Sequence, residues 1–185
     1  MTIDVGPGCG NRGFTWPANY SLIVKDNPAN AAGTIDYVCV YADSDMSGIE
    51  FASFADEGSE VLSTNGNTSG SNLGAIGDQQ NEYNAPGDFT AFNINVGEYI
   101  GIYWSGGNID RDSSGFAGMW WVANDQIPCS SVTFNLEVDD TISLYAIGTE
   151  AGGETYELSA LISGASATGS PGMNVLRELS ASIGA

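Results

Sequence analysis

Short apolar runs separated by polar clusters recur along most of the chain. Gly, Asn, Asp and Ser fill the gaps between the runs, which is the pattern of an antiparallel β-sandwich or barrel. The runs that predict strands cover residues 34–42, 48–54, 89–96, 98–104, 117–122, 132–138 and 141–147. The sequence therefore predicts an all-β fold whose strands are joined mostly by turns.

Alternation within two of these runs indicates which side chains face the core. Every second residue of 132–138 is apolar and the others are polar, so this strand should have one buried and one wet face. In 98–104, Ile100, Ile102 and Trp104 share one face, whereas Gly101 on the other face leaves room for a neighbouring ring or backbone. Both runs predict half-buried strands.

Two long polar stretches, 63–87 and 105–115, are too rich in Gly, Ser and Asn to predict regular structure. We expect the first to be a solvated loop. The second places Arg111 between Asp110 and Asp112, directly after an aromatic strand, and is predicted to be a contact loop.

The composition changes after the last predicted strand and divides the chain in two. Residues 1–148 are predicted to form a jelly-roll-like β-sandwich, and residues 149–185 a tail rich in Gly, Ala and Ser. This tail forms either extra strands or an assembly arm that packs on a neighbouring subunit, and we favour the arm. Its apolar islands contain Tyr156, Leu158, Leu161, Val175, Leu176 and Leu179.

Charge excludes several classes of function. The chain has no histidine, four basic residues and 23 acidic ones, for a net charge of −19. Without an imidazole, a hydrolase triad cannot be assembled, and so many negative charges repel a phosphate backbone. We expect a protein that is not an enzyme, has no nucleic-acid partner and faces outward into salt solution.

Neither a membrane span nor a disulfide is expected. No apolar run approaches the roughly 18 residues of a span, and the first residues lack the basic and apolar regions of a signal peptide. The sequence therefore predicts assembly in the cytoplasm without disulfides, with Cys39 a small buried apolar residue. A bridge between Cys9 and Cys129 is the less favoured alternative.

Acidic residues in two places suggest a weak metal site. Asp43 and Asp45 imitate the start of a calcium loop, but Phe54 stands at the twelfth position, where such a loop carries a bidentate Glu. Asp110 and Asp112 show the same spacing. A turn is favoured at Asp43 and Asp45, and both a turn and a metal site stay open at Asp110 and Asp112. No cofactor is expected, and bound Ca²⁺ is the alternative.

Aromatic residues provide the best candidate contact surface. Trp120 and Trp121 are adjacent, so in a strand one should face the core and the other solvent or a partner. With Trp104 and Arg111 they are the candidate surface for a sugar or a protein, although a purely structural role has equal weight. Glycoside cleavage by two of the many carboxylates is a third, weaker hypothesis.

Several stretches resemble a jelly-roll-like β-sandwich module found in bacteriophage virion proteins. The similar stretches are IDVGPG at 3–8, Arg12, 20–33, GEYIGIY at 97–103, 112–120, 127–129 and ISLY at 142–145. KDNPANAAG at 25–33 is the most distinctive of them. The resemblance implies a capsid decoration protein, head fibre or tail protein, and it carries over no catalytic residue.

These observations lead to two hypotheses about function. The first is a non-enzymatic structural protein on the outer surface of a phage virion, whose partners are other virion proteins and copies of itself, with neither nucleic acid nor membrane involved. The alternative is a lectin-like carbohydrate-binding module that recognises a host-surface glycan, with or without calcium. Solvent-facing Trp or Tyr rings would favour the alternative.

Overall fold

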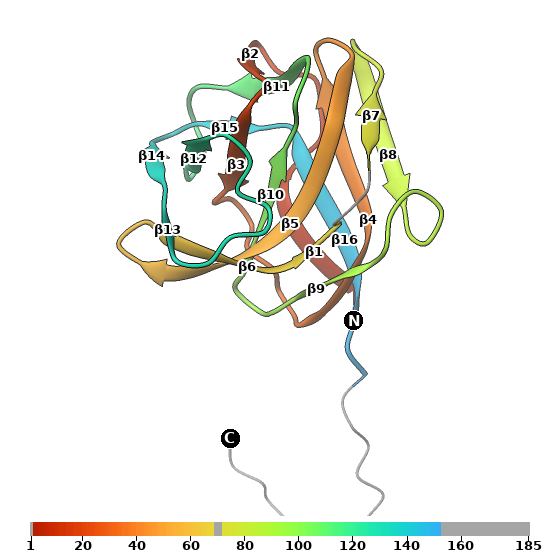
Figure 1. Ribbon diagram of the computed structural model, residues 1–185, viewed down its shortest axis with the longest axis vertical. Coiled ribbons are helices and arrows are strands. Elements are labelled where there is room, and N and C mark those ends of the chain that lie inside the picture. Colours follow the sequence, from red (N-terminus) through yellow and green to blue (C-terminus); the bar gives the residue numbers. More distant parts are fainter. Residues whose placement is uncertain (1, 69–71, 153–185) are drawn as a thin grey trace, which may run out of the picture. The chain divides into compact units, whose positions relative to one another are not determined.

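Two antiparallel β-sheets packed face to face make up the part of the chain that the structure describes (Figure 1). This structure is a computed structural model that describes residues 2–68 and 72–152, and within these ranges every regular element is a strand. The prediction of an all-β, antiparallel sandwich is confirmed. No helix long and apolar enough to cross a membrane occurs among the described residues.

The first sheet contains eight strands. Its main path is β1 (Thr2–Gly8), β16 (Leu144–Glu150), β4 (Gly33–Ala42), β11 (Asn108–Asp112) and β15 (Thr141–Ile142). Off this path, β2 (Phe14–Pro17) pairs with β11, while β8 (Gln79–Asn84) and β9 (Phe92–Ile94) pair with β4. The first and last strands of the described chain therefore lie side by side.

The second sheet also contains eight strands. Its path is β13 (Val132–Thr133), β6 (Val61–Asn67), β5 (Met46–Gly58), β10 (Tyr99–Tyr103), β3 (Tyr20–Val24), β12 (Met119–Ala123) and β14 (Asn135–Glu137), with β7 (Leu73–Ala75) beside β5. Because β13 and β14 are separated only by Phe134, the two ends of this path meet and the sheet returns on itself.

The hydrophobic residues form two clusters, one on each face of the second sheet. Leu22 of β3 joins the larger cluster between the sheets, whereas its neighbour Ile23 joins the smaller one inside the closed sheet. The smaller cluster consists of Ile23, Ala52, Phe54, Leu62, Trp120, Ile127 and Phe134. Alternation along the strands thus supplies two cores.

β10 behaves as its sequence predicts. Ile100, Ile102 and Trp104 are fully buried on one face. On the other face, a Cβ added to Gly101 would lie 2.6 Å from the ring of Phe54. The expectation that this glycine makes room for a neighbouring ring is confirmed.

Both stretches that were expected to be loops contain strands, so these expectations are wrong. The stretch 63–87 contains most of β6 together with β7 and β8, and 105–115 contains β11. In β8 only Tyr83 is buried, because the strand is covered on one side only and its other residues face solvent. A polar sequence is therefore compatible with a strand at this position.

The stretch KDNPANAAG covers the free edge of β1. The side chain of Asn30 accepts a hydrogen bond from the backbone N–H of Asp4 (3.0 Å) and donates to the carbonyl of Thr2 (3.2 Å). The backbone carbonyl of Asn27 accepts a hydrogen bond from the backbone N–H of Gly6 (2.9 Å). These contacts satisfy edge groups that would otherwise be open to pairing with another chain.

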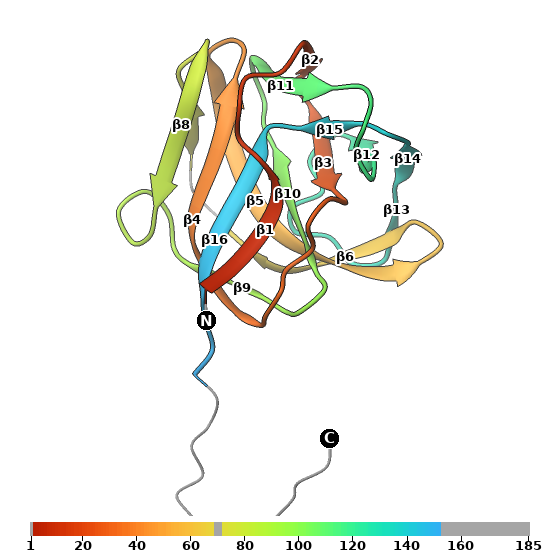
Figure 2. The same cartoon turned by 180° about the vertical axis from the view of Figure 1, so that it is seen from behind.

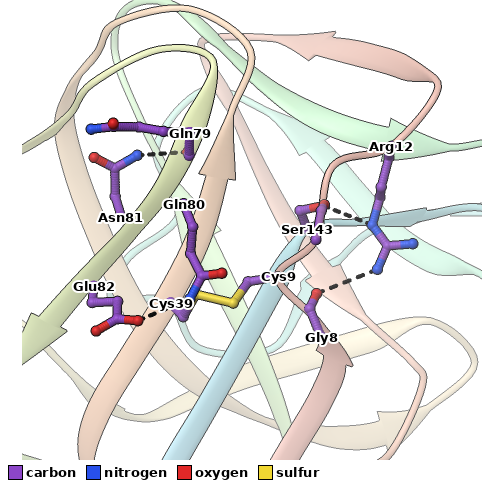
Figure 3. Close-up of a disulfide and its surroundings, with 10 residues drawn as sticks. Gly8, Cys9, Arg12, Cys39, Gln79, Gln80, Asn81, Glu82 and Ser143 are labelled. Carbon is purple, nitrogen blue, oxygen red and sulfur yellow. Dashed lines mark hydrogen bonds between the residues drawn. A yellow bond between two sulfur atoms is a disulfide. The ribbon is translucent and has the colours of Figure 1, made fainter.

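A disulfide joins Cys9 to Cys39, with 5.8 Å between the two Cα atoms, and Figure 3 shows it beside the side chains of Gln80 and Glu82. Cys39 is fully buried as predicted, but the expectation of a chain without disulfides is wrong. The less favoured alternative, a bridge between Cys9 and Cys129, is wrong as well, because Cys129 is free. The sequence does not indicate that Cys9 is the partner of Cys39, because only the fold brings the segment after β1 next to β4.

The two ends of the described chain leave from the same end of the sandwich. Thr2 of β1 pairs with Thr149 of β16, while β2 and β11 lie at the opposite end (Figures 1 and 2). The described residues belong to one compact unit, Met1–Gly153. The six residues predicted for an assembly arm, Tyr156, Leu158, Leu161, Val175, Leu176 and Leu179, lie outside the described residues.

Candidate functional site

A shallow pocket lies where β2, β3 and β11 come together. Its lining consists of Trp16, Pro17, Tyr20 and Arg111, and its volume is about 160 Å³. We call this site the Trp16 pocket. Pairing of β11 with β2 creates it, since Ile109 lies opposite Trp16 and Arg111 lies opposite Phe14.

Three aromatic rings contact one another at this site, two from the lining of the pocket and the third from Trp121. The ring of Trp16 lies 5.9 Å from that of Tyr20 and 6.1 Å from that of Trp121, and Tyr20 and Trp121 are 5.8 Å apart. The Tyr20 ring meets both tryptophans edge-on, at 90° and 72°. Edge-to-face packing of this kind holds the three rings in fixed orientations.

Arg111 is held between an aromatic ring and a buried carboxylate. Its guanidinium carbon lies 4.7 Å from the centre of the Trp16 ring. Its Nε donates to Oδ1 of Asp140 (3.0 Å), and its Nη2 lies 2.5 Å from Oδ2 of the same residue. This two-pronged ion pair fixes the plane of the guanidinium group.

Burial works against the charge on Asp140. Its side chain is only 1% exposed, and loss of solvation raises the pKa of its carboxyl, while Arg111 acts in the opposite direction. The positive charge of Arg111 is thus matched by a carboxylate beneath it. The Trp16 pocket therefore presents hydrogen-bond donors without a net positive charge.

Only part of the contact surface expected from the sequence is accessible. Trp104 is fully buried in the larger core, and its indole N–H donates to the carbonyl of Gly107 (3.1 Å). Trp120 lies in the smaller core, packed edge-on against Tyr99 with 5.0 Å between ring centres. Neither ring is free to meet a partner, because each fills a core.

The two adjacent tryptophans point to opposite faces of the strand, as the sequence predicts. Trp121 is partly buried and packs against the larger core beside Trp16 and Tyr20. Of the four residues expected to form a contact surface, only Arg111 lines the Trp16 pocket, and Trp121 contacts the rings of Trp16 and Tyr20.

Sequence reasoning missed three of the four residues of the pocket: Trp16, Pro17 and Tyr20. The aromatic and proline residues of FTWPANY were a usable local signal of a contact site. No local signal connects this segment to Arg111, because their proximity depends on the pairing of β2 with β11.

The acidic residues considered for metal binding serve mainly as hydrogen-bond acceptors. Asp45 accepts from the N–H of Gly77 (2.8 Å), Asp110 from the N–H of Arg12 (2.8 Å), and Asp112 from the N–H of Gly13 (3.3 Å). Asp43 lies near the side chain of Asn108. Within residues 2–68 and 72–152, no group of three or more acidic, Cys or His residues is placed to hold a metal ion.

Each basic residue of the described chain is engaged internally. Arg12 forms an ion pair with Asp112 (2.8 Å), Arg111 pairs with Asp140, and Nζ of Lys25 lies 4.7 Å from the centre of the Trp120 ring. The fourth basic residue, Arg177, lies outside the described residues. The surface of the sandwich therefore displays carboxylates with few opposing charges.

Comparison with protein-family models, curated proteins and solved structures gives no match to this chain.

Proposed function

We propose that this protein is a non-enzymatic structural module on the outer surface of a bacteriophage virion. The observation that carries the proposal is the charge of the sandwich. The chain has a net charge of −19, and the three basic residues in its described part are all occupied by internal partners. Such a surface is repelled by packaged nucleic acid and is well solvated in salt solution.

The resemblance to virion modules is compatible with this role. Its most distinctive stretch, KDNPANAAG, covers the edge of β1 through Asn27 and Asn30 and buries Ala29 and Ala31. These residues perform a structural task, which explains why the similar stretches need carry no catalytic chemistry.

One end of the sandwich also suits contacts with a partner. The strands β2 and β11 lie at the end opposite the pair of Thr2 and Thr149 (Figures 1 and 2). In this proposal, other virion proteins or copies of the protein would meet it at the end with β2 and β11.

Immunogold labelling of intact phage particles tests the proposal. Antibodies against residues 1–153 should label the outside of unopened particles, and antibodies against the major capsid protein provide the control for accessibility. Two results would contradict an outer-surface location: labelling that appears only after particles are opened, or no labelling of particles from a phage that encodes this protein.

A further inference from the structure

We propose that the Trp16 pocket binds one neutral sugar unit of a glycan. The use of this site for attachment to a host surface rests on the proposed virion location, whereas the binding itself does not. The pocket is small, carries no net positive charge and has polar groups that are unpaired within the described part of the chain.

The size of the pocket selects a small ligand. At about 160 Å³ it is below the roughly 300 to 1,000 Å³ of pockets that enclose a drug-sized molecule. Rings of Trp16 and Tyr20 and the exposed ring of Pro17 give it a mostly apolar lining. One sugar ring, which has an apolar face and polar edges, suits this combination of size and lining.

Charge argues against ionic ligands of either sign. Aromatic rings attract cations, but the guanidinium group of Arg111 already lies 4.7 Å from the Trp16 ring centre and would repel a second cation. An anion would meet an arginine that is neutralised by Asp140, on a chain with a net charge of −19. A neutral ligand avoids both penalties.

Unpaired polar groups at the pocket match the hydroxyls of a sugar. Among the described residues, neither Nη1 of Arg111 nor the hydroxyl of Tyr20 has a hydrogen-bond partner. Trp16 is 9% exposed, and its buried indole N–H also lacks an acceptor in the described part of the chain. Sugar hydroxyls could pair with the groups of Arg111 and Tyr20, whereas the N–H of Trp16 is buried, so that Trp16 contributes only through its ring.

The location of the pocket allows a glycan to reach it. β2 and β11 lie at the end of the sandwich opposite Thr2 and Thr149, and Pro17 is exposed there (Figures 1 and 2). The pocket is shallow and open, so a sugar unit that is part of a longer glycan could enter it.

NMR titration of the full chain tests the proposal. The probes are methyl β-glucoside, methyl α-mannoside and methyl β-galactoside at about 10 mM, a range in which weak binding is still visible. Among the indole N–H signals of the four tryptophans, that of Trp16 should move with at least one probe. The signal of Trp104 should not, because its N–H is bonded to Gly107 inside the core.

Two variants locate the binding site. Tyr20→Leu should weaken binding about tenfold, since it removes one ring of the lining. The matched control is Tyr99→Leu, which removes another tyrosine packed edge-on against a tryptophan but far from the pocket in the smaller core, and it should change affinity less than twofold. Arg111→Lys keeps the charge opposite Asp140 but loses the planar fork, so it should also weaken binding. It replaces Tyr20→Leu in this test if that variant does not fold.

Each outcome supports or overturns the inference. Binding of a neutral sugar that Tyr20→Leu or Arg111→Lys weakens and Tyr99→Leu spares supports it. Absence of binding or equal effects of all variants overturns it. Glucuronate and tetramethylammonium serve as an anionic and a cationic probe in the same titration, and binding of these alone also overturns it. These results leave the immunogold experiment unaffected, so a failed sugar site and a failed virion location are distinguishable.

Discussion

At the scale of single residues, Arg12 joins segments that are distant in sequence. Its Nε donates to the Ser143 hydroxyl (2.8 Å), its Nη1 contacts Asp112 (2.8 Å), and its Nη2 donates to the carbonyl of Gly8 (3.3 Å; Figure 3). The guanidinium group also lies 4.8 Å from the centre of the Phe116 ring. One side chain thereby ties the end of β1 to β11 and to the junction between β15 and β16.

Replacing Arg12 should therefore destabilise the fold. We expect Arg12→Met to lower the free energy of unfolding by about 2 kcal/mol, because it removes charge-assisted hydrogen bonds and leaves the Ser143 hydroxyl with fewer partners. Urea denaturation followed by tryptophan fluorescence measures the change.

Lys25→Met is the matched control for this prediction. Lys25 also lies over an aromatic ring, that of Trp120, but forms no ion pair among the described residues. Lys25→Met should lower the free energy of unfolding by less than about 1 kcal/mol. Equal losses in the two variants would show that the hydrogen bonds of Arg12 contribute nothing beyond its ring contact.

At the scale of elements, two predicted strands are divided where they change partners. The run 132–138 pairs with β6 before Phe134 and with β12 after it. The run 141–147 pairs with β11 before Ser143 and with β4 after it. The apolar pattern was continuous in both runs, because it reports burial and carries no information on which strand lies alongside.

The disulfide is a covalent link between elements that lie far apart in sequence. It closes a loop between residues 30 positions apart, which should contribute about 3.6 kcal/mol by restricting the unfolded chain. Dithiothreitol should therefore lower the melting temperature of the protein, measured by scanning calorimetry. Cys9→Ser should melt at the temperature of the reduced protein and show no further response.

Cys129→Ser serves as the control, since Cys129 is free. This variant should respond to dithiothreitol as strongly as the unmodified chain. A melting temperature of the unmodified chain that is insensitive to the reductant would mean that the disulfide does not form or does not stabilise the fold.

At the scale of the whole molecule, negative charge and burial of carboxyl groups act in the same direction. Burial raises the pKa of Asp110, and burial together with Asp125 raises the pKa of Glu50. Ionising these groups costs more in the folded state than in the unfolded state. Repulsion within a chain of net charge −19 adds to this cost.

Stability should therefore increase as the pH is lowered from 7 toward about 5. A carboxyl whose pKa is raised by folding stabilises the fold fully below its unfolded pKa, and this contribution is lost as the pH rises through the folded pKa. Thermal melting at constant ionic strength should show a higher melting temperature at about pH 5 than at pH 7.

Two variants assign this dependence to buried groups. Asp110→Asn should reduce the pH dependence, because it removes a buried titrating group and keeps an acceptor for the N–H of Arg12. Asp139→Asn, at an exposed position, should leave it nearly unchanged. A melting temperature that falls steadily between pH 7 and pH 5 would contradict the prediction.

By itself, the sequence determined the all-β class, the runs that form β4, β5, β9, β10, β12 and the strands between residues 132 and 147, and the buried face of β10. These properties depend on alternation within a few residues, which a local pattern records. The sequence did not single out β1, β2 or β3, which also line the larger core. The tertiary structure alone decided the Cys9–Cys39 pairing, the division of two strands and the meeting of Arg111 with Trp16 and Tyr20. They depend on the register between distant strands, which is set by the packing of the whole sandwich rather than by any one segment.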